Sequence, residues 1–394
     1  MSAELQLLLT ASGVALAALT LPGTLWLLVL TLAGLCPPAR ARELPARGRI
    51  AIVVPAHNEE LRLPRTLANL RAEALRDGDA NVVVVADNCS DATADLARSQ
   101  GARVLVRNDA SKRGKGYALD FAFRALLAED FRYFVVVDAD SALDEGFLHV
   151  LRCHFAAGAD AIQARYTVLN AGDSLRTRFM ELALAAFNVL RPRGRSVLGF
   201  SAGLLGNGFA LRRDVLESLP YAAGSIVEDL EYHLVLVFHG VAVTFADEAT
   251  VRGEMPSAGG GVRQQRVRWE GGRLRMLLEH APGLAADLFR GHLRAAEPLL
   301  DLLLPPLAYH VALVGALALL PFDWARVAGC AGLAVIALHV VAAAIVGRLP
   351  LSRLLVLGCA PFYVAWKLCL LPATLAAAAR DHPWVRTARD GVRS

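Results

Sequence analysis

The sequence lacks the short motifs that identify several common classes of protein. It contains neither the G-x-G-x-x-G run of dinucleotide-binding turns nor the G-x-x-x-x-G-K-[ST] phosphate loop. Its six cysteines form no C-x-x-C pair, so neither a disulfide framework nor a structural zinc site is expected. The net charge is only +4, without the basic block that nucleic-acid binding usually needs. We therefore expect no nucleic-acid partner and neither NAD nor P-loop chemistry.

The N-terminal segment lacks charge altogether between Glu4 and Arg40. This stretch is longer than the roughly 20 apolar residues that are needed to cross a bilayer. A cleaved signal peptide would have a positive charge before a shorter apolar core, and the first four residues carry none. The sequence therefore predicts a retained transmembrane helix over residues 1–39. The arginines of the basic linker that follows, residues 40–48, favour a cytoplasmic position for this end of the helix.

Three further apolar segments are Leu302 to Phe322, Val327 to Gly347, and Leu354 to Ala379. They predict a membrane region over residues 299–379, with two or three spans. Three crossings would place the basic tail, residues 380–394, outside, whereas its arginines favour the cytoplasm. Either the preference of arginines for the cytoplasmic side fails at this tail, or the last segment is a re-entrant or interfacial hairpin broken at Pro361 or Pro372. Lys367, which is costly at mid-bilayer, favours the hairpin and a cytoplasmic tail.

Residues 49–269 have ordinary polarity and alternate between strand-like and helix-like stretches. The strand-like runs are short and mostly β-branched. They are Ile50 to Val54, Val82 to Ala86, Val104 to Val106, and Phe134 to Val137. This rhythm predicts a mostly parallel sheet with helices on both faces and with ligands at the carboxyl ends of its strands.

Several acidic residues occur at the carboxyl ends of the predicted strands, where a parallel sheet binds its ligands. Asp87 ends the second strand, Asp138 and Asp140 follow the fourth, and Glu228-Asp229 comes later in the chain. Two carboxylates at a strand end can hold Mg2+ or Mn2+ together with phosphate oxygens. A further carboxylate can act as the base toward an acceptor hydroxyl. The structural alternative is that these residues cap helices or form turns.

This acidic series is followed by Gln265-Arg266-Val267-Arg268-Trp269. The order and spacing resemble the inverting family 2 glycosyltransferases, and the Gln-x-x-Arg-Trp element resembles their membrane-embedded branch, which includes cellulose, chitin and hyaluronan synthases. The resemblance implies an α/β GT-A domain with a mostly parallel, Rossmann-like sheet, joined to α-helical transmembrane segments. Residues 270–298, which mix arginines with leucines, are expected to form interfacial amphipathic helices.

The resemblance also implies roles for individual residues. Asp140 is expected to be the direct metal ligand beside Asp138, and Asp229 the catalytic base, although Val227 stands where relatives have threonine. The nucleotide-sugar would contact Pro55, His57, Asn58, Glu59, Asp87, Lys115 and Asp138. The acceptor and diphosphate would contact Glu228, Gly206, Asn207, Gln265, Arg268 and Trp269. A juxtamembrane Arg-Trp anchor remains the structural alternative for the last two.

The resulting hypothesis is transfer of a sugar with inversion from a UDP-sugar to a growing polysaccharide, an exopolysaccharide or envelope glycan. The Gln-x-x-Arg-Trp element favours this polymerising reaction. Single transfer to a lipid or polyprenyl-linked acceptor is the alternative, and a nucleotide-binding membrane sensor or transporter is the non-enzymatic one. The expected location is the bacterial inner membrane, multi-pass, with the catalytic domain in the cytoplasm. With so few spans, a chain-extruding channel would need an accessory export protein or a homo-oligomer.

Overall fold

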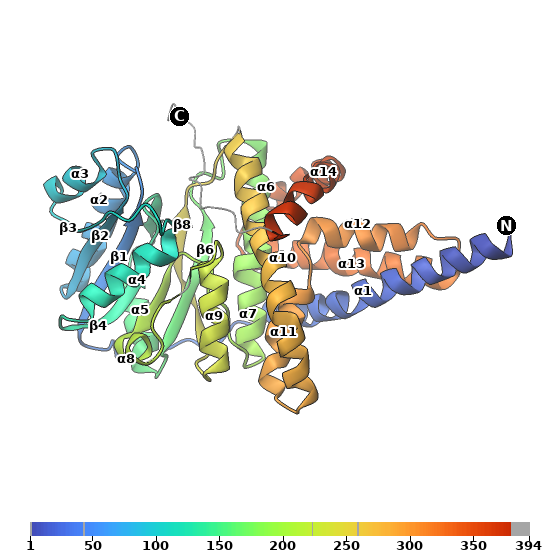
Figure 1. Ribbon diagram of the computed structural model, residues 1–394, viewed down its shortest axis with the longest axis horizontal. Coiled ribbons are helices and arrows are strands. Elements are labelled where there is room, and N and C mark those ends of the chain that lie inside the picture. Colours follow the sequence, from blue (N-terminus) through green and yellow to red (C-terminus); the bar gives the residue numbers. More distant parts are fainter. Residues whose placement is uncertain (1, 42–43, 223, 258–259, 380–394) are drawn as a thin grey trace.

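The computed structural model describes residues 2–41, 44–222, 224–257 and 260–379 (Figure 1). An α/β body lies at one end, a layer of helices follows, and a helical protrusion extends from the other side of that layer. The predicted basic tail 380–394 and Arg42 of the linker lie outside the described residues.

The body is built on an eight-stranded sheet with the order β3-β2-β1-β4-β7-β6-β8-β5. The first four strands in this order are parallel, which confirms the alternating pattern, whereas β7 pairs antiparallel with both β4 and β6. The sheet is therefore mixed. The strands are β1 (Arg49–Ala56), β2 (Ala80–Asp87), β3 (Arg103–Arg107), β4 (Phe131–Val136), β5 (Ser141–Leu143), β6 (Ala161–Val168), β7 (Phe209–Arg212) and β8 (Val243–Gly253).

Two apolar cores cover the two faces of this sheet, because successive strand residues point to opposite sides. Ile50 and Ile52 of β1 pack on one face, and Ala51 and Val53 pack on the other. The first core includes side chains of α2 and α5, and the second includes side chains of α4 and α9. The helices of the body are α2 (Leu63–Asp77), α3 (Thr93–Ser99), α4 (Lys115–Leu126), α5 (Phe147–Ala156), α8 (Arg213–Ser218) and α9 (Glu228–Phe238).

A layer of helices separates this body from the protrusion (Figure 1). It contains a rod made of α6 (Leu175–Leu184), the π-helical turn η1 (Ala185–Leu190) and α7 (Arg191–Val197). The other members are α10 (Gly260–Phe289), η2 (Leu293–Ala295) and α11 (Ala296–Leu303). Since α10 begins at Gly260, the Gln-x-x-Arg-Trp element lies inside this long helix and does not precede it.

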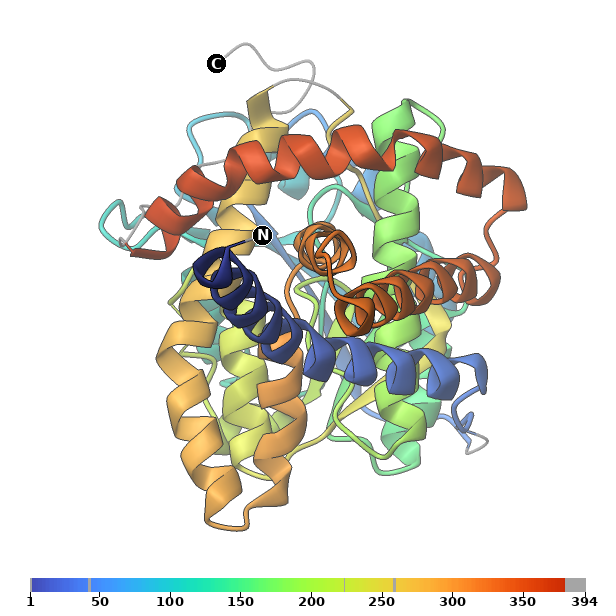
Figure 2. The same ribbon diagram turned by 90° about the vertical axis from the view of Figure 1, so that its right-hand side faces the viewer.

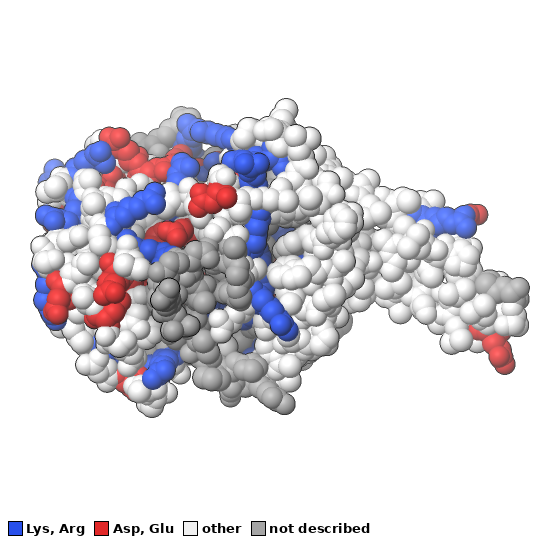
Figure 3. Space-filling model, turned by 90° about the horizontal axis from the view of Figure 1, so that it is seen from above, with Lys and Arg blue, Asp and Glu red and all other residues white. Residues whose placement is uncertain are grey.

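The protrusion consists of α1 (Ala3–Leu35), α12 (Leu307–Ala318) and α13 (Asp323–Val346). On the face shown in Figure 3, charged side chains gather on the body and are nearly absent from the protrusion except at its far end. Three segments are long and apolar enough to cross a membrane: α1, α13 and residues 351–379. The helix α1 alone is about 50 Å long at 1.5 Å per residue, which exceeds the hydrocarbon thickness of a bilayer.

The segment predicted as a span from Leu302 to Phe322 does not form one straight helix. The helix α11 ends at Leu303, α12 begins at Leu307, and the two are bent by 78°. Pro305 and Pro306 lie at the break, where the missing N–H groups and the proline rings prevent the helix from continuing. This bent pair is either one broken span or a re-entrant loop.

The last segment, η3 (Leu351–Cys359) and α14 (Ala360–Ala379), crosses the direction of α12 and α13 (Figures 1 and 2). An interfacial helix would have this orientation if the protrusion lies in a bilayer. Lys367 is buried there and forms an ion pair with Glu270 of α10, which supplies the partner that an ammonium group in an apolar segment requires. The interfacial position of this segment stays a prediction.

Candidate functional site

A single continuous cavity of about 740 Å³ begins at the carboxyl ends of β1, β2 and β4 and extends between the helices of the layer and of the protrusion. Nearly all of the predicted site residues line it, although they come from seven separate parts of the sequence. The lining includes Pro55, His57, Glu59, Asp87, Lys115, Asp138, Asp140, Gly206, Glu228, Asp229, Gln265, Arg268 and Trp269. Only Asn58 and Asn207 of the predicted set are not among the lining residues.

The end of the cavity formed by the parallel strands is polar, and its side chains form hydrogen bonds and ion pairs with one another. Asp87 is buried, and its carboxylate accepts a hydrogen bond from Arg107 at 2.6 Å. The ring of His57 lies 2.7 Å from the carbonyl oxygen of Asp87. Asn58 joins the two strand-end loops by accepting a hydrogen bond from the backbone N–H of Ser90 at 2.7 Å. Asn58 is thus placed to hold the loops in position, and His57 and Asp87 face the cavity.

Asp138 and Asp140 lie just beyond β4, as the sequence indicated. Asp140 is buried, and Asp138 forms an ion pair with Lys115 from the first turn of α4. Asn207 is buried behind them: its side chain accepts from the backbone N–H of Asp138 at 3.1 Å and donates to Ser141 at 2.9 Å. Asn207 therefore fixes the position of the two aspartates, a role that differs from the acceptor contact predicted for it.

The two aspartates fit a hard divalent cation, because carboxylate oxygens are the ligands that Mg2+ and Mn2+ prefer. Among the described residues no group of three His, Cys, Asp or Glu side chains could hold a metal ion. Asp138 and Asp140 would hold such a cation together with diphosphate oxygens of a donor. When bound, the cation would neutralise charge on the leaving diphosphate.

Glu228 and Asp229 begin α9 and enter the cavity from the opposite side. Burial and the adjacent Asp229 raise the pKa of Glu228 to about 8. Burial likewise raises the pKa of Asp229, although the backbone N–H of Leu230 and the charge of Lys115 oppose the shift. Burial would lower the pKa of Lys115, but Asp138, Glu228 and Asp229 together outweigh it and raise that pKa. Near neutral pH the pair therefore retains a proton, and its ionised form is a better proton acceptor than an exposed aspartate.

Gly206 lies against Asp229 of this pair. A Cβ atom there would lie 2.9 Å from Oδ2 of Asp229, and the backbone has φ +78°, a left-handed value that favours glycine. The carbonyl oxygen of Gly206 also accepts a hydrogen bond from Lys115. The sequence assigned Gly206 to the acceptor and diphosphate contacts, and in the structure its backbone approaches the carboxylate of Asp229, the predicted base.

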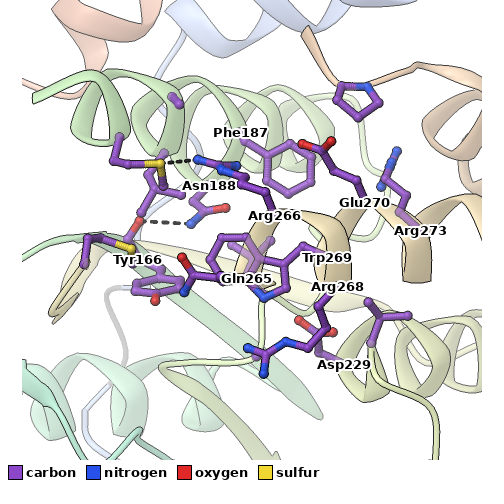
Figure 4. A pocket seen from close by; sticks show the side chains of 18 of the residues that line it. Tyr166, Phe187, Asn188, Asp229, Gln265, Arg266, Arg268, Trp269, Glu270 and Arg273 are labelled. Atoms are coloured by element: carbon purple, nitrogen blue, oxygen red, sulfur yellow. Dashed lines mark hydrogen bonds between the residues drawn. The ribbon is translucent and has the colours of Figure 1, made fainter. Parts of the chain in front are cut away.

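The helix α10 places its motif over the middle of the cavity (Figure 4). Gln265, Arg268 and Trp269 lie on the part of α10 that faces Asp229 and the sheet, whereas Glu270 and Arg273 point to the other side. Gln265 is buried, and Trp269 packs against a cluster that contains Met180 and Met255. The motif thus lies between the carboxylates and the remainder of the cavity, where an arginine can hold a phosphate and an indole ring can stack on a sugar.

The far end of the cavity was not predicted from the sequence. Its walls are mostly apolar and come from α6, α12, α13, η3 and α14. They include Phe179, Leu182, Leu307, Val311, Leu333, Ile336, Val340, Leu357, Tyr363 and Val364. Three arginines, Arg191, Arg195 and Arg273, lie along this part of the lining. The run Arg191-Pro192-Arg193-Gly194-Arg195 in an apolar neighbourhood was the available signal, and it carried no motif.

Comparison with known proteins agrees with this architecture. Residues 45–272 match the family described as glycosyltransferase like family 2. A probable glycosyltransferase of Bacillus subtilis, YdaM, is 26% identical over 60% of this chain and 57% of that protein. Beta-monoglucosyldiacylglycerol synthase of Trichormus variabilis is 28% identical over 58% of this chain and 50% of that protein. These matches span only about half the length of the relatives.

Among solved structures, the mannosyltransferase PcManGT from Pyrobaculum calidifontis, in complex with GDP-Man and Mn2+, has a TM-score of 0.57 and 21% identity. The similarity covers 94% of this chain and 97% of that one, so the fold is shared from the body through the helices that follow it. The family match covers more than half of the sequence and includes every strand of the sheet. With its GT-A fold, this chain belongs to glycosyltransferase family 2.

Proposed function

We propose that this protein transfers a single sugar, with inversion, from a UDP-sugar to a hydroxyl group of a lipid-borne acceptor. One observation carries the proposal: the cavity that contains the catalytic carboxylates continues without interruption between apolar side chains of α12, α13 and α14. A hydrophilic sugar chain would gain little from such walls, whereas an acyl or polyprenyl chain would bury apolar surface there. The same helices include the segments that are apolar enough to lie in a membrane.

In this reaction Asp229 removes the proton of the acceptor hydroxyl as its oxygen attacks the anomeric carbon of the donor sugar. The bond from that carbon to the diphosphate oxygen breaks on the opposite face, and UDP leaves. Lys115 and Arg268 are placed to compensate its negative charge. Asp138 and Asp140 would hold Mg2+ or Mn2+ against the same diphosphate. Glu228 keeps its proton at neutral pH and so avoids a second negative charge beside Asp229.

The comparison with relatives supports a lipid acceptor. The product named for the Trichormus variabilis relative, monoglucosyldiacylglycerol, is a lipid that carries one sugar. A weaker match over 83 residues, at 35% identity, is to a 4,4'-diaponeurosporenoate glycosyltransferase of Staphylococcus haemolyticus. For the present protein we infer a bacterial inner-membrane location, with the α/β body in the cytoplasm.

Synthesis of a growing polysaccharide is the second candidate. The arrangement of Gln265, Arg268 and Trp269 beside Asp229 favours it, because this element resembles the membrane-embedded synthases. An accessory export protein or a homo-oligomer would then have to complete a path for the chain.

The test uses the full chain in lipid nanodiscs with Mg2+ or Mn2+, a panel of UDP-sugars and a bacterial lipid extract. UDP release is followed, and the product is sized and partitioned into organic solvent. The proposal requires a lipid-soluble product with one added sugar that disappears in Asp229→Asn and Asp140→Ala. Asp160→Asn, at an exposed carboxylate paired with Arg212 outside the cavity, is the matched control. A long water-soluble chain would support the polysaccharide, and no mutant-sensitive transfer would refute both.

A further inference from the structure

We infer that the acceptor carries a phosphate group between its apolar tail and its reacting hydroxyl, and that Arg191 binds this phosphate. The inference rests on the proposed function, because it concerns the acceptor of that reaction. The binding site lies in the apolar part of the cavity, where the sequence contains no recognised motif.

Arg191 is buried, and no carboxylate of the described residues forms an ion pair with it. Its side chain is 4% exposed, and it lines the cavity at the start of α7. Among the described residues it has no hydrogen-bond or ion-pair partner, and its Nε atom is buried without an acceptor. Its guanidinium carbon lies 5.2 Å from the centroid of the Phe187 ring, which carries no charge. Buried charges in proteins are normally paired, so an unpaired guanidinium that faces a cavity indicates an absent anion.

The neighbouring charges do not satisfy Arg191. Arg195, one helical turn later, pairs with Glu297 at 2.8 Å and with Asp301, and Arg273 of α10 pairs with Asp301 at 3.1 Å. Both carboxylates are thus bonded to the other two arginines. This group of five side chains has three guanidinium groups and two carboxylates, which leaves one positive charge in excess. Burial, and the charges of Arg273 and Arg195, lower the pKa of Arg191 to about 9 although Asp301 opposes the shift, so the group stays cationic at neutral pH.

The position of Arg191 fits the middle of an amphipathic acceptor. Leu190, the preceding residue, packs against Ala342 and Ala343 of α13, so Arg191 stands where the protrusion meets the layer. On the other side, Arg195 donates to the carbonyl of Ala202 at 3.2 Å, in the loop that continues to Gly206 and the catalytic carboxylate. Arg191 is therefore one helical turn from Arg195, the residue that contacts this loop, and it borders the apolar walls.

Phosphate is the anion that this geometry suits. A guanidinium group can donate two parallel hydrogen bonds to a phosphate, and exclusion of water strengthens the interaction. A lipid with its tail between α12 and α13, its phosphate at Arg191 and its hydroxyl at Asp229 would use the full length of the cavity. Two sources of this chemistry are a phosphoglycerolipid headgroup and a polyprenyl diphosphate that carries a sugar. Both place phosphate between tail and hydroxyl.

The experiment compares acceptors that differ in phosphate. Phosphatidylglycerol and diacylglycerol with identical acyl chains are supplied in nanodiscs, and a short polyprenyl-diphosphate-linked monosaccharide is the third probe. Arg191→Gln is expected to raise the apparent KM for whichever phosphate-bearing acceptor is used by about 30- to 100-fold, the usual effect of losing a desolvated charged pair. The KM for the UDP-sugar should stay within about twofold, because Arg191 lies away from the donor end.

Two further variants distinguish binding from folding. Arg191→Lys keeps the charge and should recover most of the lost affinity, leaving a deficit of about 5- to 10-fold. Arg193→Gln is the matched control, because Arg193 lies on the same helix, pairs with Asp247 at 3.0 Å and does not line the cavity. It should leave the acceptor KM unchanged. UDP binding by each variant reports whether the body remains folded.

A binding measurement separates failure of this inference from failure of the proposed function. If the wild type glycosylates diacylglycerol as well as the phosphate-bearing lipids, and Arg191→Gln alters neither, the phosphate site is refuted while the lipid acceptor stands. If no lipid is glycosylated, equilibrium binding of phosphatidylglycerol and diacylglycerol to the wild type and Arg191→Gln decides the site. Equal binding by the two proteins, or no preference for the phosphate-bearing lipid, would overturn it.

Discussion

The two ends of the cavity are built on different principles. At the donor end, short strand-end loops hold charged groups that are already bonded to one another, as in the Asp87–Arg107 and Lys115–Asp138 pairs. At the other end, long helices supply apolar walls and Arg191, which has no hydrogen-bond or ion-pair partner in the part of the chain that the structure describes. These bonded pairs hold the side chains of the first end in place, as a site for the proposed anionic, metal-bound donor would require. The apolar end is shaped by the packing of helices, and only a few of its side chains can determine which ligand binds.

The largest effect on the rate of transfer should come from Asp229, which lies between the two ends of the cavity. Asp229→Asn removes the base while keeping the shape of the side chain, and we expect transfer to fall by about 10³-fold, within the range of general-base catalysis. UDP binding should persist, because the donor end keeps its own carboxylates. Initial rates of UDP release and calorimetric UDP binding check the two halves of this prediction. A mutant that transfers at the wild-type rate would show that another group accepts the proton.

Gly206→Ala tests how tightly the base is held. The new methyl group would meet Asp229 and would also require a strained left-handed backbone, so we expect about a 100-fold loss of rate and a loss of about 1–3 kcal/mol in the free energy of unfolding. Gly172→Ala is the control, since no atom lies within 4 Å of its Cβ position. Transfer rates and thermal unfolding measure both effects. If the two alanine variants behave alike, the close contact has no functional importance.

A bulky residue in the apolar end of the cavity should weaken binding of the acceptor without affecting binding of the donor. Val340 lines the cavity, whereas its neighbour Val341 on α13 is 38% exposed and does not. Val340→Trp is expected to raise the KM for a lipid acceptor about tenfold and to leave UDP binding unchanged, because it fills space that the tail would occupy. Val341→Trp should change neither quantity. Loss of donor binding in Val340→Trp would mean that the two ends are not independent.

The smallest predicted effect is on the pH profile. Because burial raises the pKa of both Glu228 and Asp229, the base loses its proton at a higher pH than an exposed aspartate does. The rate of transfer should therefore rise with pH, with a midpoint above that of an exposed aspartate. Glu228→Gln should leave this rise unshifted, because Glu228 keeps its proton up to about pH 8 and places no negative charge beside Asp229 while Asp229 ionises. The logarithm of kcat against pH is the measurement, and a rise that moves to lower pH in Glu228→Gln would show that Glu228 is already ionised in the wild type.

The donor end could be predicted because its chemistry is local in the sequence. The first four strands and the aspartates after β4 follow from runs of a few residues, and the structure has each where the pattern indicated. The strand β7 has only four residues and pairs antiparallel with β4. It therefore did not belong to the alternation of strand-like and helix-like stretches from which the parallel strands were predicted. Asn207 was assigned by resemblance to the acceptor, while its actual partners, Asp138 and Ser141, lie some 70 residues earlier in the chain.

The apolar end could not be predicted, because it depends on which helices pack together. The break between α11 and α12 turns one expected span into two helices, and α10 extends through the region expected to be a separate interfacial segment. Arg191 differs from its neighbours because Arg195 and Arg273 form the ion pairs with the nearby carboxylates, those of Glu297 and Asp301. A sequence shows the arginines but not which of them are neutralised.

The contact between Gly206 and Asp229 also has a genetic consequence. A substitution at Gly206 introduces two separate faults, a steric one that a shift of the carboxylate could relieve and a conformational one that lies in the glycine's own backbone. No single change elsewhere corrects both. A selection for suppressors of Gly206→Ala should therefore return revertants to glycine in preference to second-site mutations, whereas suppressors of Val340→Trp should appear at several positions around the enlarged side chain.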